Sequence, residues 1–418
     1  MIQPPPTQSL LFDGLAVWLQ RQGLHEVEIT DVVQNFGRRL VAGGISLHRV
    51  SVGGIMLHPV FGALDIVWDA QHDTVRQQLM PRHEATTQEF RNNPFYHMAA
   101  NDIPFLRCRL DQGKLEHEFP IFDSFRADGV TDYFGFFHSY GRTGEVLWAD
   151  LPPGLEGVLG SFATRRLDGF SDEEIAYLEA LSTPLALTVK STTTYGLAKA
   201  LLETFLGKLS GGHVLDGLVE RGDGRMINCV LWYCDLRSST AMAEIMPLDE
   251  YLTMLNDYFE CTASTVLDHG GEVLKFIGDA VMAIFPIEGD TRPAIDMSRA
   301  AVMTAREALS KGERKNAERR EKNLPPIEFG IALHAGEVMY GNVGTARRLD
   351  FTVTGPAVNE VTRLESLCKT LDIPVVASAG LNELFPGDMA SLGVHAVAGV
   401  ERGLDTYTLP EYAADTSD

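Results

Sequence analysis

The stretch LKFIGDAVMAIF (274–285) limits the possible fold more than any other part of the sequence. It consists of two apolar runs that are separated only by Gly-Asp, and a glycine at the first of two turn positions suits a tight β-hairpin. We therefore predict strands over 273–277 and 280–285. Lys275 then lies on the first strand and Asp279 at the turn. A turn aspartate and an edge-strand lysine are also common structural features, so this stretch alone does not assign them a role.

The segments around this hairpin alternate between strand and helix patterns, which is typical of a mixed α/β domain. Strand patterns cover 227–236, 327–344 and 349–355, and helix patterns cover 248–270, 296–312 and 357–370. We predict one domain over 223–410, followed by a tail at 411–418. The charged block 312–323 is predicted to be a solvated extension of the preceding helix, with a dimerisation arm as the alternative.

The first half of the chain has its own pattern of strands and helices. Strand patterns occur at 44–50, 54–59, 63–68, 131–139, 144–149 and 156–163, and a helix pattern occurs around 15–19. A long helix is predicted over 169–207, with Ser171 as its N-cap and acidic residues in its first turn. These patterns predict a second α/β domain over 1–195, joined to the first by a helical linker over 196–222.

Composition narrows the class of protein. The 418 residues carry a net charge of −22, which argues against a nucleic-acid partner and means that a polyanionic substrate needs metal ions or a local basic pocket. No apolar run reaches the roughly 18 residues of a membrane span. The N-terminus lacks the pattern of a signal peptide. Five cysteines without a CxxC pair favour reduced thiols. We therefore expect a cytoplasmic protein.

A second acidic position lies at the end of an apolar strand, in VLWYCDLRSST (230–240). Asp235 precedes a Ser/Thr-rich turn into a helix, where backbone N–H groups can hold a phosphate; an N-cap role is the alternative. If this strand neighbours the hairpin, Asp235 and Asp279 meet. Two carboxylates above a phosphate site suggest a pair of Mg²⁺ ions.

The helix pattern at 357–370 places two polar side chains together. Asn359 and Arg363 are four residues apart and therefore share a helix face. Such a pair can hold a ribose oxygen and a phosphate, and a surface polar pair is the alternative interpretation. Basic residues elsewhere, Lys369 and Arg347-Arg348, are predicted mainly to be solvated surface charges rather than triphosphate contacts.

Six positions in register resemble one enzyme family, the class III nucleotidyl cyclase catalytic domain. They are Asp235 in CDLRSST, Lys275 and Asp279 in KFIGD, Thr352 in FTVTG, and Asn359 with Arg363 in NEVTR. The resemblance covers about 223–410. It implies a ferredoxin-like α/β fold and a head-to-tail homodimer whose active sites are shared between the subunits.

The resemblance also implies a role for each catalytic position. Asp235 and Asp279, aided by the backbone carbonyl of Leu236, would hold two divalent metal ions, Mg²⁺ or Mn²⁺. From the partner subunit, Asn359 would orient the ribose and Arg363 would stabilise charge on the α-phosphate. The reaction implied is cyclisation of a nucleoside triphosphate, with release of pyrophosphate.

Two positions bear on the choice of base. Lys275 would donate to adenine N1 and Thr352 would accept from N6, a Lys/Thr pair that resembles one subclass of adenylate cyclases. The resemblance thus implies ATP as substrate and cyclic AMP as product. The alternatives are a guanylate or mixed-specificity cyclase and a non-catalytic nucleotide-binding homologue. A diguanylate-cyclase-like domain would need a GG[DE]EF-type turn, which IGDAVMAIF does not supply.

Residues 1–195 resemble a GAF-type sensor domain in their run of strands and in the helix GFSDEEIAYLEALSTPLAL. This resemblance implies that a small-molecule or protein signal regulates the cyclase. The identity of that signal cannot be inferred from the sequence.

Overall fold

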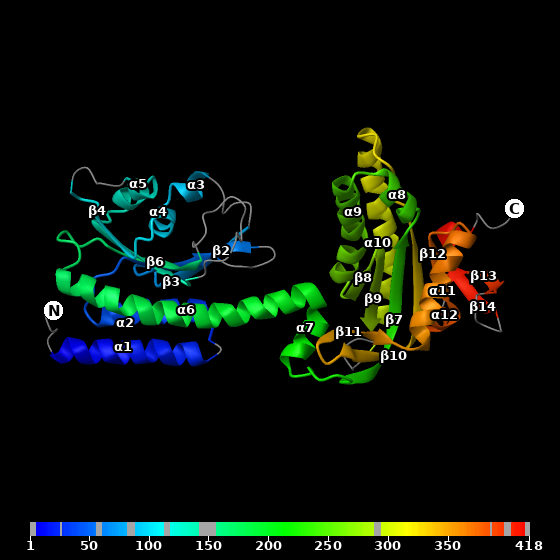
Figure 1. Cartoon of the computed structure of the whole chain (residues 1–418), viewed down its shortest axis with the longest axis horizontal. Helices are drawn as coiled ribbons and strands as arrows, with labels where there is room; N and C mark the ends of the chain where they lie inside the picture. Colours follow the sequence, from blue (N-terminus) through cyan, green and yellow to red (C-terminus); the bar gives the residue numbers. More distant parts are fainter. Residues whose placement is uncertain are drawn as a thin grey trace. The chain divides into compact units, whose positions relative to one another are not determined.

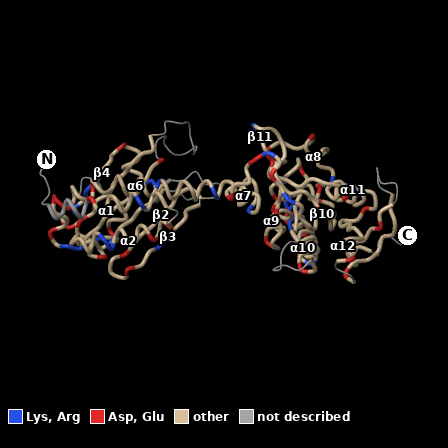
Figure 2. The backbone as a smooth tube through the Cα atoms, turned by 90° about the horizontal axis from the view of Figure 1, so that it is seen from below, with Lys and Arg blue, Asp and Glu red and all other residues tan. Residues whose placement is uncertain are grey.

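The computed structural model describes residues 6–25, 27–55, 61–81, 88–112, 118–141, 156–287, 294–384, 387–396 and 403–413. The chain forms two compact mixed α/β units, Met1–Leu201 and Leu202–Asp418 (Figure 1). Acidic and basic residues are interspersed along both units (Figure 2). Within the described residues, no helix is both long and apolar enough to cross a membrane. As predicted, all five cysteines carry free thiols, and all are buried.

The first unit is built on a six-stranded antiparallel sheet with strand order β3-β2-β1-β6-β5-β4. The strands are β1 Arg49–Ile55, β2 Phe61–Asp69, β3 Thr74–Pro81, β4 Phe105–Arg109, β5 Asp132–Ser139 and β6 Gly157–Thr164. Helices α1 Pro6–Leu24, α2 Ile29–Ala42 and α6 Asp172–Leu206 cover one face; α3 Gln88–Arg91, α4 Pro94–Ala100 and α5 Ile121–Ala127 lie over the other (Figure 1). The last residues of α6 belong to the second unit.

Most predicted elements of this unit are present, but the start of the sheet differs. The strand predicted at 44–50 is displaced to β1, which begins at Arg49, and residues 56–59 of the strand predicted at 54–59 lie outside the described residues. Ile45 and Leu47 are buried apolar residues of a loop, and this burial made their segment resemble a strand. The strand predicted at 144–149 lies outside the described residues. The long helix predicted at 169–207 is confirmed as α6.

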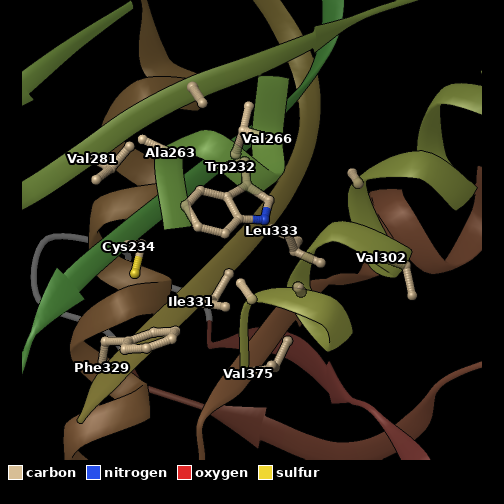
Figure 3. Close-up of a cluster of buried hydrophobic side chains, with 14 of the residues drawn as sticks. Trp232, Cys234, Ala263, Val266, Val281, Val302, Phe329, Ile331, Leu333 and Val375 are labelled. Carbon is tan, nitrogen blue, oxygen red and sulfur yellow. The ribbon is translucent and has the colours of Figure 1, made fainter. Parts of the chain in front are cut away.

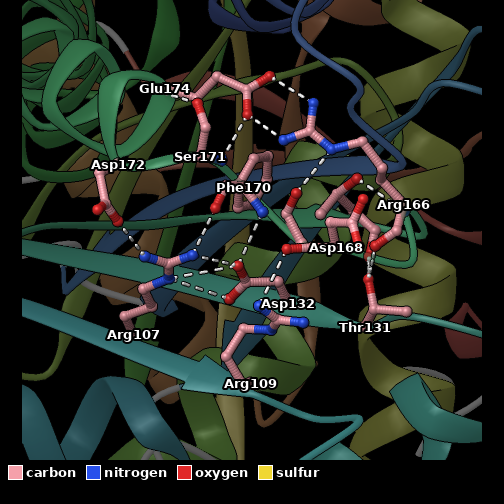
Figure 4. Close-up of polar contacts among 12 residues, drawn as sticks. Arg107, Arg109, Thr131, Asp132, Arg166, Asp168, Phe170, Ser171, Asp172 and Glu174 are labelled. Carbon is pink, nitrogen blue, oxygen red and sulfur yellow. Dashed lines mark hydrogen bonds and ion pairs between the residues drawn. The ribbon is translucent and has the colours of Figure 1, made fainter.

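A polar network fastens the start of α6 to the sheet (Figure 4). The buried carboxylate of Asp132 accepts from the Arg107 guanidinium at 2.9 Å and from the Phe170 N–H at 2.9 Å. The predicted N-cap is also confirmed: Ser171 Oγ accepts from the Glu174 N–H, and the Glu174 carboxylate accepts from the Ser171 N–H. This reciprocal pair is a capping box, and it fixes where the helix begins.

Replacing Asp132 by asparagine is expected to lower the free energy of unfolding of this unit by about 1.5–3 kcal/mol, the scale of a hydrogen bond to a charged group. The amide keeps the shape but loses the charge that satisfies Arg107. The measurement is urea denaturation followed by circular dichroism. Asp172→Asn is the control, because Asp172 also contacts Arg107 but is fully exposed, and no measurable change is expected. Equal effects of the two variants would contradict this account.

The second unit is built on an eight-stranded sheet with strand order β13-β14-β12-β10-β7-β9-β8, and β11 pairs with β10. The strands are β7 Gly224–Leu236, β8 Glu272–Ile277, β9 Ala280–Pro286, β10 Phe329–Thr345, β11 Arg348–Thr354, β12 Val375–Ser378, β13 Ala390–His395 and β14 Leu404–Thr408. The helices are α7 Lys208–Leu215, α8 Ser239–Ile245, α9 Leu248–Asp268, α10 Ala294–Glu321, α11 Pro356–Thr370 and α12 Ala379–Leu384, followed by a short 3-10 helix at Pro410–Tyr412.

Two apolar cores lie on opposite faces of this sheet. One core, around Trp232, joins the sheet to α9 and α10 (Figure 3). The other packs Val361 and Leu364 of α11 against the opposite face. The alternation along β7 explains this division, because successive side chains of a strand point to opposite faces. The central strand β7 is therefore packed on both faces, and this packing fixes the position of the polar residues at its end.

The elements predicted for this unit are largely confirmed. β8 and β9 form the expected hairpin, and Gly278 adopts a φ of 64° at its turn. The charged block continues α10 to Glu321, as predicted, although it is not wholly solvated. Arg319 is buried and pairs with Asp257 at 3.2 Å. That ion pair holds the helix extension against α9.

Candidate active site

The two predicted metal-binding carboxylates meet at one edge of the second unit. β7 pairs with β9 in antiparallel register, with Cys234 opposite Val281. The next residue along β7, Asp235, therefore lies beside the turn that carries Asp279. Burial raises the pKa of the Asp235 carboxyl, a hydrogen bond from Lys369 opposes this rise, and the charge of Asp279 adds to it. The N-cap alternative for Asp235 is wrong, because the cap of α8 is Ser238.

A basic side chain occupies the position where a cation would neutralise these acids. Lys369, in the last turn of α11, places its Nζ 2.5 Å from Asp235 Oδ2. Lys369 is exposed, as expected of a surface charge, but it also pairs with Asp235 because the C-terminal turn of α11 lies beside the end of β7. Arg347 and Arg348 are exposed, as expected. The Lys369 ammonium lies where a bound cation could lie. Its position shows that the carboxylates can accommodate positive charge.

A third carboxyl group lies behind this pair. Glu365 is 4% exposed, and its Oε1 has no hydrogen-bond partner among the described residues. Burial raises its pKa to about 7, against the opposing charge of Lys369. The described residues contain no group of three or more His, Cys, Asp or Glu arranged to hold a metal ion. Ions bound by Asp235 and Asp279 therefore need further oxygen ligands, which suits the preference of Mg²⁺ for a few carboxylates, water and phosphate.

The stability of the second unit is expected to fall as pH rises from about 4.5 to about 7. In that window the folded chain keeps a proton on Glu365 that the unfolded chain releases, so the free energy of unfolding drops by up to about 3 kcal/mol and then levels off. Glu365→Gln should remove this component. The measurement is denaturation across pH without divalent metal, with Glu383→Gln, an exposed glutamate of α12, as control. An unchanged pH slope in Glu365→Gln would refute the assignment.

The two predicted base-recognising residues lie on β8 and β11. Lys275 Nζ is 3.2 Å from Asp350 Oδ2. Thr352 is two positions beyond Asp350 and therefore shares its face of the strand. It is 3% exposed, and its hydroxyl has no hydrogen-bond partner among the described residues. Sequence analysis missed Asp350, although the alternation in LDFTVTG was a usable signal for its shared face.

The two residues predicted to contact ribose and phosphate project from α11. The apolar face of this helix is buried against the sheet, whereas Asn359 is exposed and Arg363 is partly exposed. Within the described part of the chain, neither side chain makes a hydrogen bond or an ion pair. Within one chain, Asp235 therefore lies beside Asp279, and Lys275 lies beside Asp350. Among the described residues, Arg363 forms no hydrogen bond or ion pair with Asp235 or Asp279.

This arrangement agrees with a family match. Residues 224–407 match the family model of the adenylate and guanylate cyclase catalytic domain. This segment is a class III cyclase catalytic domain. The chain is 36% identical over 152 residues to the adenylate cyclase of Anabaena cylindrica, covering 36% of this chain and 29% of that protein. It is 29% identical over 190 residues to adenylate cyclase 1 of Rhizobium meliloti, covering 42% of this chain and 28% of that protein.

Solved structures resemble the same part of the chain. A bacterial light-regulated adenylyl cyclase is 27% identical, with a TM-score of 0.39, and the match covers 45% of this chain and 92% of that one. A guanylyl cyclase, Cya2, is 26% identical, with a TM-score of 0.39, and the match covers 44% of this chain and 93% of that one. The chain itself spans less than a third of the length of the two curated relatives named above.

Proposed function

We propose that this protein is an adenylate cyclase that converts ATP to 3′,5′-cyclic AMP and pyrophosphate. The observation that carries the proposal is the meeting of Asp235 and Asp279 around a positive charge. These carboxylates, with the backbone carbonyl of Leu236, would hold two divalent ions. When bound, Mg²⁺ or Mn²⁺ lowers the pKa of the ribose 3′-hydroxyl and neutralises charge on the triphosphate.

The side chains of the protein would position the substrate. Asn359 holds a ribose oxygen, so that the 3′-oxygen lies in line with the α-phosphorus. The new bond joins this oxygen to phosphorus, and the bond to pyrophosphate breaks. Arg363 donates to the α-phosphate oxygens, where negative charge develops during the attack. Since neither Asn359 nor Arg363 has a partner within the described chain, both are available to a second subunit, which supports a homodimer with shared active sites.

Recognition of adenine rests on Lys275 and Thr352. The ammonium donates to N1, and the buried hydroxyl of Thr352, which has no partner among the described residues, accepts from N6. Asp350 holds the ammonium on this side of the sheet. The same carboxylate is a specific reason to test GTP. Guanine offers donors at N1 and N2, which Asp350 accepts, while Lys275 donates to O6.

The experiment is a competition between substrates. Purified protein is incubated with equimolar ATP and GTP, with Mg²⁺ or Mn²⁺, and cyclic AMP and cyclic GMP are quantified by mass spectrometry. Mostly cyclic AMP supports the proposal, and mostly cyclic GMP supports recognition through Asp350. If neither product forms, residues 223–418 are tested alone. Absence of product there as well would favour a non-catalytic nucleotide-binding protein.

The proposal also divides the chain by role. Residues 1–195 would be a GAF-like regulatory domain, 196–222 a helical linker, 223–410 the catalytic domain and 411–418 a tail. α6 and α7 cover much of the proposed linker as two separate helices, which Gly207, with a φ of 88°, divides. A signal at the first domain would act by setting the geometry of the cyclase dimer. Deletion of residues 1–195 should therefore change activity or dimer affinity. An unchanged rate and an unchanged dimer dissociation constant would reject this regulatory role.

A further inference from the structure

The first unit has a partly open pocket, here called the cavity, on the sheet face that α4 and α5 cover. Its volume is about 100 Å³, and one water molecule needs roughly 10–15 Å³ by the same measure. The space therefore fits several waters or a small organic molecule. It is formed within this unit, and none of its lining residues belongs to the cyclase domain.

The floor of the cavity is polar, which is unusual for the interior of a small domain. Five side chains with polar groups reach it from four adjacent strands: Arg49 and Ser51 of β1, Asp65 of β2, Tyr133 of β5 and Ser161 of β6. Residues between them on β1, such as Val50, point to the opposite face and join the apolar core under α2 and α6. The sheet therefore separates a dry face from a face equipped for hydrogen bonding.

Two buried donors in this floor lack acceptors. Arg49 Nε and the Tyr133 hydroxyl are both inaccessible to solvent and have no hydrogen-bond partner among the described residues. The Ser161 hydroxyl lies close enough to Tyr133 to influence its pKa, but not in good hydrogen-bonding geometry. An unmet buried donor costs about 1–3 kcal/mol. Two such donors in one cavity indicate a ligand that supplies the acceptors.

The charges in the cavity define the kind of acceptor. Arg49 forms no ion pair among the described residues, and its guanidinium carbon lies 5.2 Å from the centre of the Phe125 ring. Burial lowers the pKa of Arg49, and the charge of Asp65 opposes this shift. Asp65 itself already accepts the Ser51 hydroxyl at 2.8 Å. A single guanidinium that lies against an aromatic ring suits a planar monoanion, because two of its N–H groups can donate to two oxygens of the anion at once.

The wall opposite the polar floor determines the chemistry of the rest of the ligand. It is mainly apolar, with Phe90, Phe95 and Ile121, and Asn93 also lines it. One guanidinium beside the Asp65 carboxylate and a mainly apolar wall do not suit a polyphosphate, which needs several cations. We propose that this cavity binds a small organic monocarboxylate whose oxygens accept from Arg49 and Tyr133 and whose apolar body contacts the aromatic wall. The proposal stands apart from the cyclase reaction, since it concerns binding to another unit of the chain.

The test uses the full chain and no nucleotide. Thermal unfolding is followed with a series of monocarboxylates from acetate to benzoate, each paired with its neutral amide, and with inorganic phosphate. At roughly tenfold above its Kd, a carboxylate that binds should raise the transition of the first unit by about 3–6 °C. The amide should produce less than a third of that shift. Failure of every carboxylate, an equal shift by the amide, or a shift by phosphate alone would overturn the proposal.

Two variants test whether the shift in the thermal transition arises from binding in the cavity. Arg49→Met keeps a long side chain on Phe125 but removes the charge, and it should abolish the shift. Tyr133→Phe removes only the hydroxyl and should weaken binding about 10-fold or more. Arg21→Met is the matched control, because Arg21 is an exposed arginine in the last turn of α1, which covers the other face of the sheet. If Arg49→Met does not fold, Tyr133→Phe decides the matter. Unweakened binding by folded Tyr133→Phe would refute the proposed contacts.

Discussion

Asp279→Ala is expected to abolish formation of cyclic nucleotide with either Mg²⁺ or Mn²⁺ while leaving the cyclase domain folded. Asp279 is one of the two carboxylates proposed to bind metal at the end of β7, so its loss leaves Asp235 as the remaining one, and Lys369 already pairs with Asp235. Metal ions supply several kcal/mol of transition-state stabilisation, so the rate should fall at least about 10³-fold. The fold should persist because the turn conformation is provided by Gly278.

The measurement is the initial rate of product formation over a range of metal concentrations, with circular dichroism as a check of folding. Asp268→Ala is the matched control, since Asp268 is an exposed aspartate at the end of α9 that pairs with Lys311. It should keep the wild-type rate. If folded Asp279→Ala keeps more than about a tenth of the activity, the acidic pair is not the metal site, and the observation that carries the proposed function is lost.

The meeting of Asp235 and Asp279 could be predicted because strong local patterns determine it. The hairpin turn is specified by glycine and by two apolar runs, and β7 is an apolar strand that has to be buried in the same sheet. Once β7 and β9 are neighbours, the carboxylate at the end of one strand and the carboxylate at the turn of the other lie side by side. The local patterns predicted the strands and the turn, whereas the pairing of β7 with β9 was a condition in the sequence analysis, which the structure meets.

The partners of these residues could not be predicted in the same way. Lys369 is 134 residues from Asp235 along the chain. Helical spacing shows which side chains share a face of α11, but it does not show which strand end lies beside the last turn. Likewise, Asp350 contacts Lys275 only because β11 folds back along β10. Such pairings depend on the packing of elements distant in sequence, which local patterns do not encode.

Two features of the first unit could not be predicted from the sequence for a related reason. The edge strand β3 was missed because its residues are mostly exposed and include Arg76, Gln77 and Gln78, so it lacks the alternation of a half-buried strand. The cavity was missed because Arg49 and Ser51 lie on β1 whereas Tyr133 lies on β5, far away in the sequence. Only the sheet order brings them together. The N-cap at Ser171, by contrast, is a local signal and was predicted.

Arg363→Ala is expected to lower the rate about 10²–10³-fold, the usual cost of losing one donor to charge that develops in the transition state. The Michaelis constant for the nucleotide should change much less, because the lost contact is made mainly in the transition state. Substrate dependence of the rate measures both quantities. Arg348→Ala is the control, since Arg348 is an exposed arginine on β11. A larger effect on the Michaelis constant than on the rate would assign Arg363 to substrate binding instead.

The two inactive variants together test whether the active site is shared. In the proposed dimer, Asp279 of one subunit and Arg363 of the other complete each site, so a dimer of one Asp279→Ala chain and one Arg363→Ala chain contains one intact site. Mixing equal amounts should therefore recover up to about a quarter of the wild-type rate, since about half of the dimers are mixed and each has one of its two sites. If the mixture stays inactive although mixed dimers are detected by mass, Asp279 and Arg363 must act within the same subunit, and the shared-site arrangement is wrong.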